Sequence, residues 1–96
     1  METPVLVTYA TRMGSTEEVA LAVADTLREN GLAVEVQPVR VVRLVERYGA
    51  VVLAAALYMG RLHKDARHFL VAHRGGLMEL PVVLFVLGPV SIAKKD

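Results

Sequence analysis

The chain has 96 residues, of which 54% are hydrophobic, and a formal net charge of +1. That length fits one domain, and the near-neutral, interleaved charge predicts no nucleic-acid surface. The absence of cysteine excludes disulfides, thiolate metal sites and thiol catalysis, so redox chemistry would need a bound cofactor. The amino end lacks the pattern of a signal peptide, and the apolar runs are too short to span a membrane. We therefore expect a cytoplasmic protein.

The first part of the chain predicts a strand, a helix and a second strand. Pro4–Tyr9 (PVLVTY) is a short apolar run of the kind that forms a strand covered on both faces. From about Thr16 to Glu29 the apolar side chains recur at helical spacing, and Ser15 with Glu18 forms the S-x-x-E pattern of a helix start. Leu32–Val39 (LAVEVQPV) then alternates between apolar and polar residues, which indicates a half-exposed edge strand.

The second part of the chain predicts two more strands and the helix between them. Val41–Tyr48 has the spacing of a short helix, and its solvated face would carry Arg40, Arg43 and Arg47. Ala50–Leu57 reads as another strand covered on both faces. Lys64–Arg74 predicts a helix, which Gly75-Gly76 would end or loosen, and Pro81–Leu87 predicts the fourth strand.

Strands and helices alternate along the whole chain, with crossovers long enough to hold helices. This order predicts parallel strands, right-handed connections and helices on both faces, that is, an α/β fold with an open, doubly wound sheet. Ligands of such sheets bind outside the carboxyl ends of the strands, where the strand order switches. Three loops follow covered strands at these ends: Ala10–Ser15, Tyr58–His63 and Gly88–Ser91. They are the candidate site.

The first of these loops, within the stretch YATRMGST (Tyr9–Thr16), has the chemistry of an anion site. Gly14 allows the backbone close to a ligand, and the helix that begins near Ser15 presents unpaired N–H groups and the positive end of its dipole. The hydroxyls of Thr11, Ser15 and Thr16 add donors. The loop lacks both the G-K-[ST] ending of a P-loop and a G-x-G-x-x-G pattern, which favours a terminal monophosphate. A capped helix start without a ligand explains the loop equally well.

The second loop places apolar and aromatic groups beside that pocket. Leu57, Tyr58 and Met59 follow a covered strand, and Gly60 lets the main chain turn with its amide groups exposed. An aromatic face and a soft thioether suit a flat ring system. Taken alone, these side chains fit better as a cover for the end of the sheet, whereas next to the first loop they favour a bound ring.

Other doubly wound proteins would leave different residues in the sequence. A phosphoacceptor receiver needs an aspartate at the end of the third strand, where this chain has alanines at 54–56, and a low-molecular-weight phosphatase needs a cysteine. No serine lies in a G-x-S-x-G turn. The histidines His63, His68 and His73 are five residues apart and do not stack on one helix face, so we expect no metal site. His63 is the single candidate for acid–base catalysis, and we expect no catalytic side chain.

These residues together resemble the flavodoxin family of FMN-binding domains. YATRMGST is similar to the family's phosphate-binding loop, and Leu87–Pro89 (LGP) is similar to the start of its third flavin-contacting loop. Within the family, YATRMGSTEEVA combined with AAALYMGRLHKDARHF looks most like the menaquinone-dependent protoporphyrinogen oxidase branch, whose G-x-x-H-like stretch is matched by Gly60–His63. The resemblance covers essentially the whole chain.

The resemblance implies that the intact domain binds FMN non-covalently. The phosphate would bind to main-chain N–H groups and hydroxyls of Thr11–Thr16, where Arg12 could add charge. The isoalloxazine ring would lie between Leu57–Gly60 and Gly88–Val90, with Tyr58 stacked on it. The implied cofactor-binding residues are Thr11, Arg12, Met13, Gly14, Ser15, Thr16, Leu57, Tyr58, Met59, Gly60, Gly88, Pro89 and Val90.

The implied activity is flavin-dependent oxidation of protoporphyrinogen IX with a quinone as acceptor. The near-neutral charge favours this branch over the electron-carrying flavodoxins, which are typically strongly acidic. A generic electron carrier or quinone reductase is one alternative. A non-catalytic remnant of the fold that binds at most an anion is another, from a different class. Quinone and porphyrinogen are the partners expected besides FMN.

The chain departs from the family in two respects. Ala54-Ala55 stand where relatives often have Gly-Ser near the flavin. The family also has a fifth strand and a final helix, whereas this sequence stops soon after the fourth strand. We therefore expect a single flavodoxin-like domain over residues 1–96, without the last strand and helix, whose four strands have the order 2-1-3-4. The fourth strand would expose an apolar strip and a free edge, which predicts a homodimer.

Overall fold

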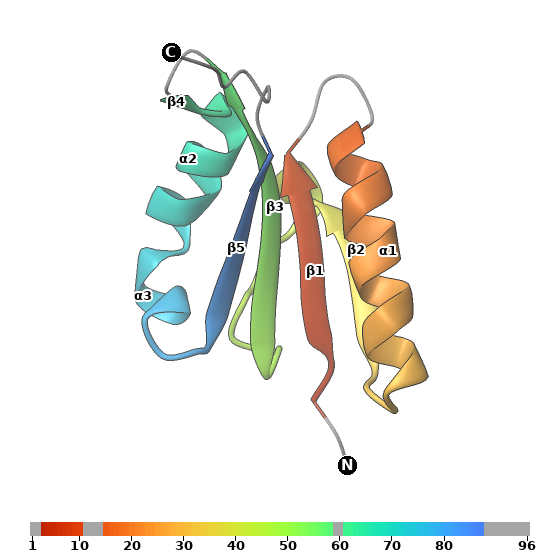
Figure 1. Ribbon diagram of the computed structural model, residues 1–96. Helices are drawn as coiled ribbons and strands as arrows, with labels where there is room; N and C mark the ends of the chain where they lie inside the picture. Colours follow the sequence, from red (N-terminus) through yellow and green to blue (C-terminus); the bar gives the residue numbers. More distant parts are fainter. Residues whose placement is uncertain (1–2, 11–14, 59–60, 88–96) are drawn as a thin grey trace.

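The computed structural model describes residues 3–10, 15–58 and 61–87, and its central feature is a five-stranded sheet (Figure 1). The strands are β1 (Val5–Ala10), β2 (Val34–Pro38), β3 (Ala50–Tyr58), β4 (Arg61–Leu62) and β5 (Val82–Leu87). The helices are α1 (Ser15–Glu29), the 3-10 helix η1 (Val39–Val41), α2 (Lys64–Ala72) and α3 (Arg74–Leu77).

The four longer strands are parallel and lie in the order β2-β1-β3-β5. Val5 of β1 pairs with Val34 on one side and with Ala50 on the other, and Val51 of β3 pairs with Val82 of β5. The short β4 is antiparallel to β3. Because β5 is the fourth strand that the sequence predicts, the α/β fold and the expected order 2-1-3-4 are confirmed.

Helix α1 covers one face of the sheet, over β1, β2 and β3 (Figure 1). The residues it buries most deeply are small: Ala20 and Ala24 have no exposed surface, so the helix can approach the strands closely. Both alanines pack against Val7, Val52 and Ala54 of the sheet. They belong to the apolar positions that recur at helical spacing, and the predicted buried face of α1 is therefore confirmed.

The opposite face of the sheet is covered by α2, α3 and residues 39–48. Side chains alternate along a strand, so Leu6 and Leu53 point away from α1, and they share a cluster with the buried Phe69 of α2 and Leu77 of α3. Helices therefore lie on both faces, as the alternation of strands and helices predicts.

The edge strand β2 has the half-exposed character that its alternating sequence predicts. Val34 and Val36 belong to the cluster beneath α1, and the intervening Glu35 points to the other face. There the hydroxyl of Tyr48 donates a hydrogen bond of 2.7 Å to Oε1 of Glu35. Tyr48 is only 3% exposed, so this bond joins the segment before β3 to the edge of the sheet.

The short helix predicted within Val41–Tyr48 is wrong. The 3-10 helix η1 ends at Val41, residues 42–44 are irregular, and residues 45–49 form turns and bends. Val42, Val45 and Tyr48 are buried, and their spacing of three residues imitates the buried face of a helix. In the structure the same spacing belongs to an irregular segment that packs on the sheet, because tertiary burial overrides a weak helical propensity. The three arginines of this region, Arg40, Arg43 and Arg47, are exposed as predicted.

The helix predicted at Lys64–Arg74 is divided into α2 and α3, and Gly75-Gly76, which were expected to end or loosen it, lie inside α3. Gly76 is buried against the segment that precedes β3. A β-carbon at this position would stand 2.6 Å from Cγ2 of Val45 and 2.7 Å from Oε2 of Glu46. The glycine therefore permits a close approach of α3 rather than a helix end.

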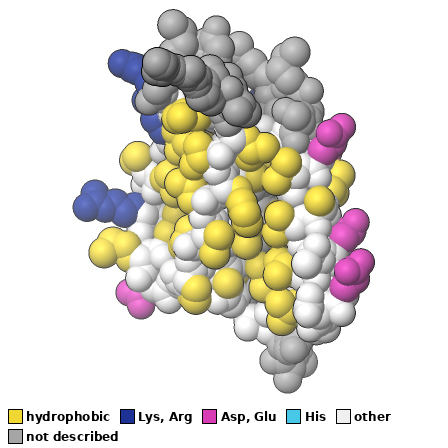
Figure 2. Space-filling view, viewed as in Figure 1, with side chains coloured by type: hydrophobic (Ala, Val, Ile, Leu, Met, Phe, Trp, Pro, Cys, Tyr) yellow, Lys and Arg dark blue, Asp and Glu magenta, His cyan; other side chains and the backbone are white. Residues whose placement is uncertain are grey.

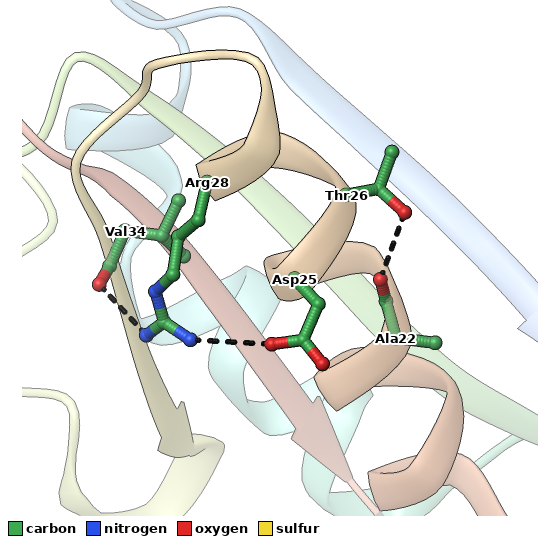
Figure 3. A network of polar contacts seen from close by, with 5 residues as sticks. All are labelled: Ala22, Asp25, Thr26, Arg28 and Val34. Carbon is green, nitrogen blue, oxygen red and sulfur yellow. Dashed lines mark hydrogen bonds and ion pairs between the residues drawn. The ribbon is translucent and has the colours of Figure 1, made fainter.

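Arg28 occupies the outer side of β2. Its guanidinium donates a hydrogen bond of 3.1 Å to the carbonyl oxygen of Val34 and lies 3.6 Å from a carboxylate oxygen of Asp25 (Figure 3). The carbonyl of Ala33 accepts from the N–H of Val5 in β1, so the next carbonyl along the strand, that of Val34, points away from β1. Arg28 thus covers a backbone acceptor at this free edge of the sheet.

The other edge of the sheet is β5, and it is apolar throughout (VVLFVL). Val82–Val86 each expose between 40% and 50% of their surface. By register, Val83 and Phe85 share a face with Val52 and Ala54, which lie on the face of α1. Figure 2 shows hydrophobic side chains gathered in the middle of the view, beside α1. The exposed apolar strip predicted at the fourth strand is therefore present.

Candidate functional site

The three predicted loops start from neighbouring strands. β1, β3 and β5 are adjacent and parallel, with Ala10 beside Ala55 and Ala56 beside Leu87, so their carboxyl ends lie at one edge of the sheet (Figure 1). From β1 the chain passes to β2 on one side and then to β3 on the other side. The strand order therefore switches at β1, which is where open α/β sheets bind their ligands.

Few of the predicted site residues are described by the structure. Thr16 is 2% exposed at the start of α1, and Leu57 is half-buried near the end of β3. Ser15 is the first residue of α1 and Tyr58 the last of β3, although their side chains lie outside the described part. Outside it altogether are Thr11, Arg12, Met13, Gly14, Met59, Gly60, Gly88, Pro89 and Val90.

The start of α1 points toward this edge of the sheet. The helix begins at Ser15, one residue earlier than the predicted Thr16, and its first N–H groups have no carbonyl partner within the helix. Its first turn also contains two acids, Glu17 and Glu18. Acids are favourable next to the positive end of a helix dipole, but they compete there with any bound anion.

Tyr9 and Glu17 connect the two elements that flank the first loop. Tyr9 is the next-to-last residue of β1, and its hydroxyl donates a hydrogen bond of 3.3 Å to Oε2 of Glu17 in α1. Burial, and then the negative charge of Glu17 and the hydrogen bond to it, raise the pKa of Tyr9 above 10.0. The phenol is therefore protonated at neutral pH and is the donor. Sequence analysis missed this pair, because no spacing rule connects a strand residue with a residue of the next helix.

The second loop is shorter than predicted, because Arg61 and Leu62 form β4. Leu57 pairs with Leu62 and Tyr58 with Arg61, which leaves only residues 59 and 60 between the paired strands. The prediction of a loop over Tyr58–His63 is therefore wrong at position 58, the last residue of β3, and at positions 61 and 62. The sequence has Met-Gly at positions 59 and 60, which is not one of the dipeptides, such as Asn-Gly, that signal a two-residue hairpin.

His63 joins this hairpin to α2. Its backbone N–H donates to the carbonyl of Ala56 at 2.8 Å, and its Nδ1 accepts from the N–H of Asp65 at 3.0 Å, as an N-cap of α2. Its Nε2 is buried and has no hydrogen-bond partner among the described residues. The ring thus caps the start of α2 through Nδ1.

Within the described ranges no group of three or more histidine, aspartate or glutamate side chains could hold a metal ion. A hollow of about 230 Å³ lies between η1 and α2 and is lined by Val39, Phe69 and His68, among others. None of the described residues of the three predicted loops lines this hollow.

A comparison with protein families matches the model of the flavodoxin domain to residues 6–96, nearly the whole chain. The chain belongs to the flavodoxin domain family. None of the curated proteins matches the sequence significantly.

Solved structures of two kinds, an oxidoreductase and flavodoxins, have the same fold as this flavodoxin domain. Rubredoxin oxygen:oxidoreductase from Desulfovibrio gigas superposes with a TM-score of 0.77 at 17% identity, over 96% of this chain and 25% of that one. A flavodoxin variant of Fusobacterium nucleatum bound to flavin mononucleotide gives 0.70 at 21% identity, over 92% and 52%. The flavodoxin of Streptococcus pneumoniae gives 0.63 at 27% identity, over 88% and 59%.

This flavodoxin domain thus spans between 25% and 59% of the length of these solved proteins. The predicted flavodoxin-like fold is confirmed. Within the part of the chain that the structure describes, no helix is long and apolar enough to cross a membrane.

Proposed function

We propose that the protein binds FMN at the carboxyl edge of its sheet and transfers electrons through it. The observation that carries this proposal is the strand order β2-β1-β3-β5, which brings the ends of β1, β3 and β5 together at the switch in strand order. Membership of the flavodoxin domain family and the FMN-bound flavodoxin of the same fold support the choice of cofactor.

The described residues fit such a cofactor. The start of α1 supplies free N–H donors and the positive end of a dipole, as a phosphate requires. We assign phosphate binding to Thr11–Thr16, including Arg12, Met13, Gly14 and Ser15. We assign ring binding to Leu57, Tyr58, Met59 and Gly60 on one side and to Gly88, Pro89 and Val90 on the other.

FMN, when bound, supplies one- and two-electron chemistry that no side chain of this protein offers. The task of the chain is to hold the phosphate, orient the ring and exclude water. Leu57 is half-buried, and Ala54 and Ala55, close to the carboxyl end of β3, are buried. They leave an apolar wall there in place of polar side chains, and a less polar surrounding disfavours extra charge on the ring.

A flavin titration of the parent chain and of two variants, each with one added negative charge, tests the proposal. Ser15→Glu places a carboxylate at the start of α1. Met78→Glu adds the same charge at a residue that is 76% exposed and precedes β5, toward the end of the sheet opposite to the carboxyl ends of the strands. Binding is followed by quenching of FMN fluorescence and by the absorbance shift at tens of micromolar. We expect binding by the parent and by Met78→Glu, and binding weakened at least about tenfold in Ser15→Glu. No quenching by the parent chain would reject the proposal.

For the reaction, we propose oxidation of protoporphyrinogen IX with a quinone acceptor. The resemblance of YATRMGST and of Gly60–His63 to that branch supports it. The porphyrinogen would lose six electrons and six protons, and three quinone molecules would become three quinols. An electron carrier or quinone reductase is the second candidate, and the flavodoxins of the same fold favour it. A cytoplasmic location stays part of this proposal.

Enzyme, carrier and remnant give different results in one assay. Flavin-loaded protein is mixed with protoporphyrinogen IX and a soluble quinone, and protoporphyrin fluorescence is followed against a no-protein control. Porphyrin formation that depends on quinone supports the oxidase. Reversible reduction of the flavin without porphyrin formation supports the carrier. A chain that binds inorganic phosphate but no flavin is the non-catalytic remnant.

We also propose that the chain forms a homodimer through β5. The two edges of the sheet differ: Arg28 covers the carbonyl of Val34 at the β2 edge, whereas β5 offers six uncharged residues without proline. Exposed edges of this composition pair with further strands. A two-fold axis would place two copies of β5 antiparallel.

Sedimentation at micromolar concentration tests the dimer. Leu84→Lys introduces a charge into the middle of β5, where the side chain is 45% exposed. Leu21→Lys introduces the same charge on α1, where the side chain is 44% exposed. We expect a dimer for the parent and for Leu21→Lys and a monomer for Leu84→Lys. A monomeric parent that unfolds cooperatively would reject the proposal.

A further inference from the structure

The hydrogen bond between Tyr9 and Glu17 crosses from the end of β1 to the first turn of α1. Tyr9 packs against the cluster beneath α1, and its hydroxyl lies 3.3 Å from Oε2 of Glu17. Burial and the nearby carboxylate raise the pKa of Tyr9, which keeps the phenol protonated and able to donate. The bond therefore fixes the direction of the Glu17 side chain relative to the strand.

Glu17 is the third residue of α1, and this position matters for an anion. From the third position a glutamate can reach back to the free N–H groups at the helix start, as in a capping box. Its negative charge is also attracted by the positive end of the helix dipole. A phosphate at the start of α1 would need the same donors. A free Glu17 carboxylate would therefore compete with the phosphate and repel it.

We propose that Tyr9 is a positioning residue for phosphate binding, which holds the carboxylate of Glu17 against β1 and away from the start of α1. The proposal rests on the proposed function, because it concerns the phosphate of FMN. It adds a residue that touches neither the phosphate nor the ring and acts only through Glu17.

A double-mutant cycle with two flavins tests it. Tyr9→Phe keeps the ring and removes the donor, and Glu17→Gln removes the charge. Dissociation constants are measured for FMN and for riboflavin, which lacks the phosphate. We expect Tyr9→Phe to weaken FMN binding by about twofold to fivefold and to leave riboflavin unchanged. In the Glu17→Gln background, Tyr9→Phe should leave the dissociation constants of both flavins unchanged. In the parent background, the weakening of FMN binding by Tyr9→Phe should be smaller at high salt.

Tyr48→Phe is the matched control, because it also removes a hydroxyl that donates to a glutamate, Glu35, on the other face of the sheet. It should leave both dissociation constants unchanged. Equal weakening of FMN and riboflavin by Tyr9→Phe would show a purely structural role and overturn the inference, and so would an unchanged affinity for FMN.

A titration with phosphate distinguishes a failure of the role of Tyr9 from a failure of FMN binding. Inorganic phosphate is titrated against the parent and Tyr9→Phe, with the thermal midpoint as readout. Phosphate binding without flavin binding rejects the FMN proposal alone, and a midpoint shift that is smaller in Tyr9→Phe still supports the role of Tyr9. A parent chain that binds neither phosphate nor FMN rejects both.

Discussion

Gly76 of α3 lies so close to Val45 that a β-carbon on the glycine would stand 2.6 Å from Cγ2 of the valine. Val45 has no exposed surface, so its methyl group cannot move into solvent. The contact fixes how near α3 can lie to the segment before β3, and it has a direct consequence for substitutions at the two adjacent glycines.

We expect Gly76→Ala to lower the free energy of unfolding by about 1–3 kcal/mol, because overpacking a filled core forces side chains and backbone to shift. Gly75→Ala is the matched control: nothing lies within 4 Å of a β-carbon there, and alanine favours a helix by up to about 1 kcal/mol. Urea unfolding followed by circular dichroism measures both. Equal stability of the two variants would contradict the close approach at Gly76.

The buried hydroxyl of Thr8 lowers the stability of the folded state. The residue has no exposed surface, and its Oγ1 has no hydrogen-bond partner among the described residues. Thr8→Val replaces the hydroxyl by a methyl group of similar size, so we expect a gain of about 1 kcal/mol, or about 4–8 °C in the thermal midpoint. Thr26→Val is the control, because that exposed hydroxyl already donates to the carbonyl of Ala22 and should change stability little. A loss of stability in Thr8→Val would mean that the hydroxyl has a partner.

We expect a substitution of His63 to preserve stability when the new side chain also accepts a hydrogen bond from the N–H of Asp65. His63→Ala removes the acceptor of the Asp65 N–H, and we expect a loss of about 0.5–2 kcal/mol. His63→Asn retains an acceptor in the preferred position and should stay within a few tenths of a kcal/mol of the parent, about the spread among good caps. Chemical denaturation is the measurement, and His68→Asn, at an exposed position of the same helix, is the control. If His63→Ala and His63→Asn have equal free energies of unfolding, the capping hydrogen bond does not stabilise the fold.

The hydrogen bond from Tyr48 to Glu35 should make stability depend on pH in the alkaline range. Burial, then the hydrogen bond and the charge of Glu35, raise the pKa of Tyr48 above 10.0. The folded state thus favours the protonated phenol, so the contribution of Tyr48 is complete below about pH 10 and is lost as the pH rises through the folded-state pKa. Tyr48→Phe should lower stability at neutral pH by about 1–2 kcal/mol and flatten this alkaline decline. A decline of equal slope in Tyr48→Phe would assign it to other groups.

Local patterns predicted the regular elements well, because each depends on neighbours along the chain. The spacing that places Ala20 and Ala24 on one side of α1 and the alternation that turns Val34 inward from Glu35 are properties of a single helix and a single strand. Their burial follows from the period alone.

Elements that depend on distant partners could not be predicted in this way. Val42 and Val45 have the spacing of a helix but cover the sheet as an irregular segment, and Gly76 is inside a helix because Val45 lies against it. At the candidate site, the direction of Glu17 is set by Tyr9 in the preceding strand. Each of these depends on contacts between segments that only the tertiary structure brings together.

The strand order also determines when the protein can begin to fold. β1 is an inner strand of the sheet, yet both of its neighbours follow it in the chain: Val5 pairs with Val34 and with Ala50. During synthesis β1 must therefore stay unpaired until about thirty more residues have been added, and its second side until about fifteen beyond those. Pairing over such separations makes folding slow. β1 is thus an apolar strand that emerges before both of its partners, and a chaperone would find it unpaired in that interval.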